Sequence, residues 1–416
     1  MRQQEMTTPW YASACTGLFS RCGPVPRRPH DPAVCIWAGT LPRWGTEQKD
    51  LATGGAGWDE ASAEAAGVGE AIERWQCRAL PQDRLVTASH AHWPQDEPAI
   101  EPERWVLFHP RQYARAGFPF EPFTPQTTVS WVCCREAGSG QPWWVPEELV
   151  FLMRPAGAPH RLGLAISTGL SCGRAGDPVL LRGLQEAIER DALMGAWWGN
   201  YPLEEHELRS VLAGLPSAVA ERLLRPNLRY RCYRIASPFS SHVTVVTLEG
   251  EDCEGYCFSA GSACRETRAA SWQKAFLEAV QGRHFVRYLK ARAAEHMDAD
   301  TPVDFAGHAL YYSVHPERIH TTVLNRACAP ERSVDARAIE NTQMLASRLG
   351  ASRPVLFRQI TPPAMLAEGL DWIVMRVLVP GLQPMHGHHG YPFLGGPFWA
   401  NRNIEGWQTL LPHPFP

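Results

Sequence analysis

The sequence lacks the features that would place the protein in a membrane or outside the cell. No apolar run in its 416 residues approaches the roughly 18 residues of a membrane-spanning helix, so no membrane span is expected. The N-terminus, Met1-Arg2-Gln3-Gln4-Glu5, does not have the charged and then apolar profile of a secretory signal. The formal net charge of −3 gives no electrostatic reason to expect a nucleic acid or an anionic membrane as partner. These absences predict a cytoplasmic protein.

Two common ligand-binding patterns are also missing. No Gly-x-x-x-x-Gly-Lys-Ser/Thr loop occurs, so any ATP must be bound in another way. Cys253, Cys257 and Cys264 could be metal ligands, but their spacing fits no common zinc pattern. The twelve cysteines are scattered, and without a signal peptide they are expected to be reduced.

What the sequence does contain is a repeated five-residue motif. Glu70-Ala71-Ile72-Glu73-Arg74 recurs word for word as Glu186-Ala187-Ile188-Glu189-Arg190, and a glycine precedes each copy at the same offset, Gly67 and Gly183. A third, degenerate copy follows as Glu278-Ala279-Val280-Gln281-Gly282-Arg283. Two acids at i and i+3 lie on one face of a helix, with the arginine one turn beyond the first acid. Three such helices in one chain predict convergence on a shared cation-rich site.

The pattern of apolar residues predicts both helices and strands. The motif-bearing helices are expected at about Glu60 to Arg78, Asp177 to Trp197 and Ser262 to Ala294. Glycine-punctuated loops, residues 54–57 and 167–173, are expected directly before the first two. Strands are predicted at Ala33 to Trp37, Val129 to Cys134, Tyr230 to Ile235, His242 to Leu248 and Trp372 to Val379. Because these elements interleave without strict alternation, the fold class is α+β (mixed α/β).

Clustered carboxylates from several helices are what hard divalent cations require. The repeats supply five of them, enough for more than one magnesium ion: Glu70, Glu73, Glu186, Glu189 and Glu278. Arg74 and Arg190 would orient the acids by bidentate pairing or contact phosphate directly. The two glycine-rich loops would offer backbone N–H groups to an anion. The plain alternative, an exposed intrahelical ion pair, is the usual reading of a single motif of this kind, but the repetition favours a metal–nucleotide site.

In these blocks the sequence resembles the YcaO family, ATP-dependent enzymes that activate backbone amides in peptides. The family's Gly-Gly-Lys-Gly-like loop and Ser-Ala-x-x-Glu-x-x-Glu-Arg helix are matched by residues 54–57 and 66–74. Its second block, Ser-Asn-Gly-Leu-x-x-Gly followed by Gly-Leu-x-Glu-x-Ile-Glu-Arg-Asp, is matched by residues 167–173 and 183–191.

Two further blocks extend the resemblance. The family's Glu-x-x-Gln is matched by Glu278 and Gln281, and its strand before a Pro-Gly-Leu turn by residues 374–382, including Arg376. The similarity runs from about Thr16 to the last residue. It therefore implies a single YcaO-like domain over residues 1–416, with an N-terminal lead-in (1–50) and a tail (412–416).

The resemblance also implies roles for individual residues. It implies that the five acids bind magnesium and the phosphates of ATP. It places Arg74, Ser171, Arg190, Gln281 and Arg283 at the nucleotide or near its phosphates. The terminal Pro412-x-Pro414-x-Pro416 resembles the tail of azoline-forming members, whose terminal carboxylate lies at the active site, so Pro416 is the expected catalytic residue. The alternative for this tail is a frayed proline-rich end.

Three positions depart from the family pattern. Ala56, Ala66 and Thr168 stand where the family has lysine, serine and asparagine. Each departure removes one polar contact to the nucleotide and leaves the five acids intact.

The function implied by the resemblance is an ATP- and Mg²⁺-dependent cyclodehydratase. It would form thiazoline or oxazoline rings from Cys, Ser or Thr of a ribosomally made precursor peptide. The expected partners are that peptide, a separate ThiF-like leader-binding protein and a flavin dehydrogenase, in a homodimer or a hetero-complex. Alternatives are a thioamide- or amidine-forming enzyme of the same family and a non-catalytic scaffold subunit.

The reaction also needs a base. The Pro416 carboxylate is one candidate, and a histidine of His386-Gly387-His388-His389 is another. A metal site in this histidine stretch is less expected, because no acid lies nearby in sequence.

Overall fold

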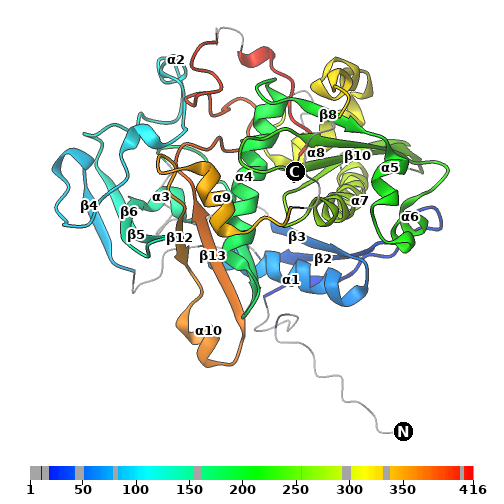
Figure 1. Cartoon of the computed structure of the whole chain (residues 1–416), viewed down its shortest axis with the longest axis horizontal. Helices are drawn as coiled ribbons and strands as arrows, with labels where there is room; N and C mark the ends of the chain where they lie inside the picture. Colours follow the sequence, from blue (N-terminus) through cyan, green and yellow to red (C-terminus); the bar gives the residue numbers. More distant parts are fainter. Residues whose placement is uncertain are drawn as a thin grey trace.

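The computed structural model describes residue 11 and residues 18–42, 51–77, 83–153, 161–253, 255–292, 301–330, 338–402 and 407–415. Helices and strands are mixed along the chain, as the sequence predicted (Figure 1). Among the described residues, no helix combines the length and the apolar character needed to cross a membrane.

The described strands form three antiparallel sheets. The largest has the order β4-β5-β12-β13-β7, with β6 also paired to β5. Its strands are β4 (Leu85–Ala88), β5 (Val129–Glu136), β6 (Pro142–Pro146), β7 (Leu170–Arg174), β12 (Leu356–Gln359) and β13 (Trp372–Leu378). The second sheet contains β8 (Leu203–His206), β9 (Arg229–Ile235), β10 (Thr244–Asp252) and β11 (Gly255–Ala263). The third contains β1 (Arg21–Pro24), β2 (Cys35–Leu41) and β3 (Leu51–Gly57).

Three long helices carry the repeated motif and pack between these sheets. They are α1 (Glu60–Gln76), α4 (Val179–Trp197) and α7 (Arg268–Arg292). Helix α4 contacts β7 and β13 of the largest sheet and β9 and β11 of the second, so it lies at the centre of the molecule (Figure 1). Helix α1 contacts β2, β3, β7 and β13, and α7 contacts β10, β11 and β3. The shorter helices are α2 (Pro110–Tyr113), α3 (Glu147–Val150), α5 (Leu208–Ala213), α6 (Ser217–Leu223), α8 (Phe305–Val314), α9 (Thr342–Leu349) and α10 (Pro363–Ala367).

Each motif-bearing helix approaches its neighbouring backbone closely, which explains the glycines. A Cβ atom on Gly55 of β3 would lie 2.3 Å from the backbone nitrogen of Gly67 in α1. A Cβ on Gly261 of β11 would lie 2.3 Å from the carbonyl oxygen of Ala275 in α7. The glycines that precede the two EAIER copies are themselves in close contact. A Cβ on Gly67 would lie 2.4 Å from the Trp37 ring, and a Cβ on Gly183 of α4 would lie 2.8 Å from the carbonyl oxygen of Gly169. The glycine before each EAIER copy is therefore a packing requirement.

The structure corrects three predicted boundaries. Residues 54–57 are not a loop but the end of β3, paired with β2. Glycine is depleted in strands, so the glycines at residues 54–57 predict a loop. Close approach of another backbone is a second reason for glycine in a strand, and it applies here. The second predicted loop is shorter than expected, because β7 already begins at Leu170. Ser262, predicted to begin the third helix, lies in β11, and the helix begins at Arg268. The five predicted strands are confirmed as β2, β5, β9, β10 and β13.

Candidate functional site

The three helices bring the five predicted acids into one electrostatic cluster. Burial raises the pKa of Glu73 well above its usual value, and the Glu186 and Glu70 carboxylates raise it further. Burial also raises the pKa of Glu186, with a further contribution from Glu189. The pKa of Glu189 is raised by burial and by Glu278. The acids thus form an unbroken series from α1 through α4 to α7.

In two of the three repeats, the strand that precedes the helix holds the first acid of that helix by a backbone hydrogen bond. The backbone N–H of Gly54 in β3 donates to Oε2 of Glu70 at 2.9 Å. The backbone N–H of Ser262 in β11 donates to Oε2 of Glu278 at 3.4 Å. In both pairs the donor precedes the acid by 16 residues, so the first and third repeats are equivalent strand–helix units.

Glu189 is held differently from the other acids. Its side chain is 4% exposed, and its oxygens accept from Ser262 Oγ at 2.6 Å and from the Cys264 N–H at 2.9 Å. The side chains of Glu70, Glu186 and Glu278 are 32%, 25% and 33% exposed. Glu189 therefore ties α4 to the end of β11, whereas the other three leave oxygen atoms accessible to a ligand.

Each of these three accessible acids also has a basic partner one helical turn away. The pairs are Arg74 Nη2 with Glu70 at 3.5 Å, Arg190 Nε with Glu186 at 3.7 Å, and Lys274 Nζ with Glu278 at 3.2 Å. These are the intrahelical ion pairs of the plain alternative. Such pairs do not require three helices to converge, so the convergence itself is what favours a ligand site.

Two other predicted site residues lie beside the acids. The side-chain nitrogen of Gln281 would lie 3.3 Å from a Cβ on Gly54, so α7 meets β3 next to Glu70. Ser171 is buried, and its hydroxyl donates to the carbonyl oxygen of Val179 at 2.9 Å, at the start of α4. Their contacts to a nucleotide stay predictions.

Arg283 does not join the acidic cluster. Its side chain is 1% exposed, and it donates to Asp252 Oδ2 at 2.8 Å and to the carbonyl oxygen of Gly250 at 3.2 Å. Five positions after Glu278, it lies on a different face of α7. The predicted nucleotide contact of Arg283 is therefore corrected to a structural role at the β10–β11 turn.

Arg376 reaches the acids from β13, although the sequence did not place it among the site residues. Its side chain is 3% exposed, and Nη2 donates to the carbonyl oxygens of Leu149 at 3.0 Å and Ile166 at 2.9 Å. Burial lowers the pKa of Arg376, while Cys77 and the Glu186 and Glu73 carboxylates act in the opposite direction. Nε and Nη1 are buried without a hydrogen-bond partner among the described residues. The sequence offered two signals for Arg376: its place in the family's strand before the Pro-Gly-Leu turn, and its charge within an otherwise apolar strand.

The spacing of the acids suits metal ions that share a nucleotide. No three of these acids, all of them described residues, bring oxygen atoms within 4.8 Å of one another, so they do not form a cage for one ion. Mg²⁺ in nucleotide sites takes one or two carboxylates and completes its octahedron with water and phosphate oxygens. The residues present therefore fit Mg²⁺ bound together with a phosphate chain.

The end of the chain is packed into the protein. Residues 412–415 are buried, the Trp197 indole N–H donates to the carbonyl oxygen of Leu411 at 2.9 Å, and the Tyr312 hydroxyl donates to that of Pro412 at 2.7 Å. The alternative of a frayed end is wrong for these residues. Pro416, the predicted catalytic residue, lies outside the described residues.

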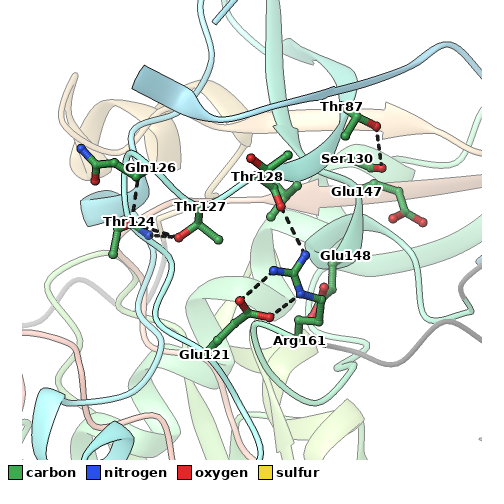
Figure 2. A pocket seen from close by; sticks show the side chains of 11 residues that line it. Thr87, Glu121, Thr124, Gln126, Thr127, Thr128, Ser130, Glu147, Glu148 and Arg161 are labelled. Atoms are coloured by element: carbon green, nitrogen blue, oxygen red, sulfur yellow. Dashed lines mark hydrogen bonds and ion pairs between the residues drawn. The ribbon is translucent and has the colours of Figure 1, made fainter. Parts of the chain in front are cut away.

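The structure also has a wide hollow that none of the five acids lines. It has a volume of about 530 Å³ and is lined mainly from β4, β5, α3 and residues 121–128. Figure 2 shows Arg161 paired with Glu121 in this hollow. Arg161 Nη2 donates to Glu121 Oε2 at 2.7 Å, and Nη1 donates to the carbonyl oxygen of Thr128 at 3.2 Å. None of the predicted site residues lines this hollow.

Three strand–helix repeats with convergent carboxylates and no P-loop define the class: a mixed α/β protein with an acidic site for a metal–nucleotide complex. The family described as YcaO cyclodehydratase, ATP- and Mg²⁺-binding, matches residues 54–383, and the chain belongs to this family. The predicted family and its ATP and Mg²⁺ cofactors are thereby confirmed.

Solved structures of this family share the fold. A heterocyclase in complex with substrate and cofactor superposes with a TM-score of 0.69 at 17% identity, over 98% of this chain and 54% of that one. The YcaO protein of Methanopyrus kandleri bound with AMPPCP and Mg²⁺ gives 0.56 at 18% identity, over 88% and 86%. The E. coli microcin synthetase McbBCD complex with pro-MccB17 bound gives 0.59 at 14% identity, over 95% and 96%. A comparison with curated protein sequences gave no match.

Proposed function

We propose that the chain is an ATP-dependent cyclodehydratase that forms thiazoline or oxazoline rings from Cys, Ser or Thr of a ribosomal precursor peptide. The observation that carries the proposal is the convergence of five carboxylates from three repeated strand–helix units. In the reaction the peptide's thiol or hydroxyl adds to the preceding carbonyl carbon, and the former amide oxygen is then eliminated. Bound Mg–ATP supplies the phosphoryl group that makes this oxygen a leaving group, with phosphate and ADP as products.

The protein's own residues hold and orient the reacting groups. Glu70, Glu186 and Glu278 are the accessible carboxylates that would bind Mg²⁺, and Glu73 interacts electrostatically with the first two. Arg74 and Arg190, one turn beyond the acids, would pair with phosphate oxygens once the metal takes over the acids. Gln281, beside Glu70, would contact the nucleotide.

The base that removes the proton in ring formation is proposed to be the C-terminal carboxylate of Pro416. Trp197, at the end of the helix α4 that carries Glu186 and Glu189, donates to the carbonyl oxygen of Leu411 just before the tail, and its ring packs against Phe415 of the tail with centroids 6.5 Å apart. Arg190 of the same helix donates to Met385 Sδ at 3.5 Å, and Met385 and Phe415 belong to the same apolar cluster. The tail is therefore anchored in the neighbourhood of the acidic helix.

A hetero-complex is proposed for the working enzyme. The chain spans about half the length of the heterocyclase it resembles. A separate, ThiF-like leader-binding protein is the proposed partner for recognition of the precursor peptide. The McbBCD relative is a complex with pro-MccB17 bound. A flavin dehydrogenase that oxidises the rings is a further proposed partner. A cytoplasmic location is proposed as well. The proposed reaction uses ATP, which the cytoplasm supplies, and the eleven cysteines among the described residues are free thiols.

Two alternatives remain to be separated by experiment. A thioamide- or amidine-forming enzyme would use the same acids with another nucleophile. A non-catalytic scaffold is suggested by Ala56, Ala66 and Thr168. Ala56 is a core residue of β3, so a lysine at this position would be buried.

The test combines nucleotide binding with product analysis. Calorimetry of the purified chain with ATP and Mg²⁺ should show binding, and its absence would leave only the scaffold. The chain, its leader-binding partner and the precursor peptide should then release ADP and remove one water per ring. A peptide in which sulfur replaces an amide oxygen would assign the thioamide-forming branch. A ring closed by an amine of the peptide would assign the amidine-forming branch.

A further inference from the structure

Four histidines from three separate segments gather at the base of the tail. His308 comes from α8, His386 and His389 from the loop after β13, and His413 from the tail. The His308 and His413 rings are stacked with centroids 3.9 Å apart, and those of His308 and His386 lie 5.7 Å apart. One ring nitrogen from each of His308, His386 and His389 lies within 4.8 Å of the other two.

Backbone carbonyls determine which nitrogen of two of these rings is protonated. His308 Nδ1 lies 2.9 Å from the carbonyl oxygen of His413, and His389 Nε2 lies 2.7 Å from that of Leu410. A carbonyl oxygen can only accept, so each of these nitrogens carries the proton. His308 Nε2 and His389 Nδ1 must then present lone pairs. Metal-binding histidines use this arrangement, since an outer N–H bonded to a carbonyl orients the ring.

Among the described residues, no hydrogen-bond donor contacts these unprotonated nitrogens. His308 Nε2, His386 Nδ1 and His389 Nδ1 are all buried without a partner among the described residues. His308 is 0% exposed and His386 is 4% exposed. His308 Nε2 and His389 Nδ1 are thus buried acceptors without a donor among the described residues, and the ring of His386 offers a third unpartnered nitrogen within the same cluster, so a cation between the three rings would satisfy them.

We propose that His308, His386 and His389 form a binding site for a divalent transition metal, with Zn²⁺ the expected ion. Neutral imidazoles are preferred ligands of zinc, and three protein ligands leave one position for water. Zinc–nitrogen bonds of about 2.0–2.1 Å place tetrahedral ligands about 3.4 Å apart, so the rings draw together slightly on binding. The sequence argued against a metal here because no acid is nearby, but an all-nitrogen site needs none.

Metal binding and docking of the tail are coupled through the outer nitrogens. His308 donates to the carbonyl oxygen of His413 in the tail, and His389 donates to that of Leu410 just before it. In return, His413 Nε2 donates to the carbonyl oxygen of His386 at 2.8 Å. The metal would therefore fix the tail that leads to the proposed catalytic terminus, at a place separate from the acids that bind Mg²⁺.

The test uses the full-length protein after removal and return of metal. The wild type should bind one Zn²⁺ per chain after dialysis, measured by elemental analysis, and Co²⁺ should give the intense visible absorption of a tetrahedral site. His386→Ala and His389→Ala should each weaken Zn²⁺ affinity more than about 100-fold, because even outer-shell changes cost 10–100-fold. His30→Ala is the matched control, since His30 is exposed and distant in sequence from the cluster.

Tail release gives a second readout that does not depend on catalysis or on variants. Digestion with a metal-independent carboxypeptidase should slow by up to about 100-fold when Zn²⁺ is present at 100 times its dissociation constant. A wild type that takes up no Zn²⁺ or Co²⁺ overturns the proposal. So does equal binding by folded His386→Ala and His389→Ala, which would assign the metal to another site.

Discussion

The pKa values of Glu73, Glu186 and Glu189 are raised because the surrounding protein shields each carboxylate partly or fully from water and because each has another carboxylate as neighbour. A folded-state pKa above the unfolded value means that the fold favours the protonated acid. The metal-free protein therefore loses stability as pH rises from near the usual value of 4.5 through the raised values. A bound cation would offset the repulsion between the ionised carboxylates. The stability that the metal-free protein loses on ionisation is therefore regained when a cation binds.

Glu186→Gln should separate the two effects. The metal-free variant should melt at a higher temperature than the wild type at neutral pH, and its stability should fall less between acidic and neutral pH. ATP-dependent ring formation should drop by about 10²–10³-fold, as when one charge-stabilising group is lost. Thermal melting across pH, with and without Mg–ATP, measures the first effect and peptide mass the second. Glu60→Gln, an exposed acid in the first turn of α1, is the control, and equal activity of both variants would contradict the assignment.

Arg283 and Gln281 lie two positions apart but should respond in opposite ways. Arg283→Met removes a buried ion-pair partner of Asp252 and should cost about 3–5 kcal/mol of unfolding free energy. Gln281→Ala should leave the melting temperature nearly unchanged and raise the KM for ATP. Urea denaturation and ATPase kinetics on both variants decide the matter. A raised KM for ATP in folded Arg283→Met, with none in Gln281→Ala, would restore the original prediction for Arg283.

At the level of elements, the repeat is a strand–helix unit rather than a helix alone. β3 with α1 and β11 with α7 share the glycine contact and a backbone donor to the first acid. The close approach brings the first acid of each of these helices against its strand, where a backbone N–H holds the carboxylate. Glycines that looked like flexible loops therefore position carboxylates.

Gly55→Ala tests this packing. Its Cβ would lie 2.3 Å from backbone atoms of Ala63 and Gly67, so α1 must move away from β3. We expect a loss of at least about 1–3 kcal/mol in unfolding free energy, the usual cost of overpacking, and weaker Mg–ATP binding. In Gly214→Ala the new Cβ would have its nearest neighbour at 3.4 Å, so this control should be nearly neutral in urea denaturation. Unchanged stability of Gly55→Ala would mean that the contact is not tight.

At the level of the whole molecule, the site joins segments from nearly the full length of the chain. β13 contributes Arg376, and α1, α4 and α7 contribute the acids. The tail is held by α4 through Trp197 and by α8 through Tyr312 and His308. Docking of the tail and completion of the nucleotide site thus depend on the same central helix.

Tyr312→Phe should weaken tail docking alone. The lost hydrogen bond to Pro412 is worth about 1 kcal/mol, so azoline formation should slow roughly fivefold while calorimetric ATP binding stays unchanged. Tyr288→Phe removes an exposed hydroxyl and is the matched control. Deletion of residues 412–416 should abolish ring formation. A truncated enzyme that removes water at the normal rate would exclude any catalytic role for the tail.

The sequence by itself determined the local features: the motif-bearing helices, the i and i+3 spacing of their acids and the five strands. These follow from residue periodicity, which acts over a few residues. Only the tertiary structure decided that Glu189 is bonded into β11, that Arg376 joins the acids while Arg283 leaves them, and that residues 54–57 form a strand. It alone brought His308 to His386 and His389. Contacts between residues so far apart in the chain depend on how the sheets and helices pack, and no local pattern records that packing.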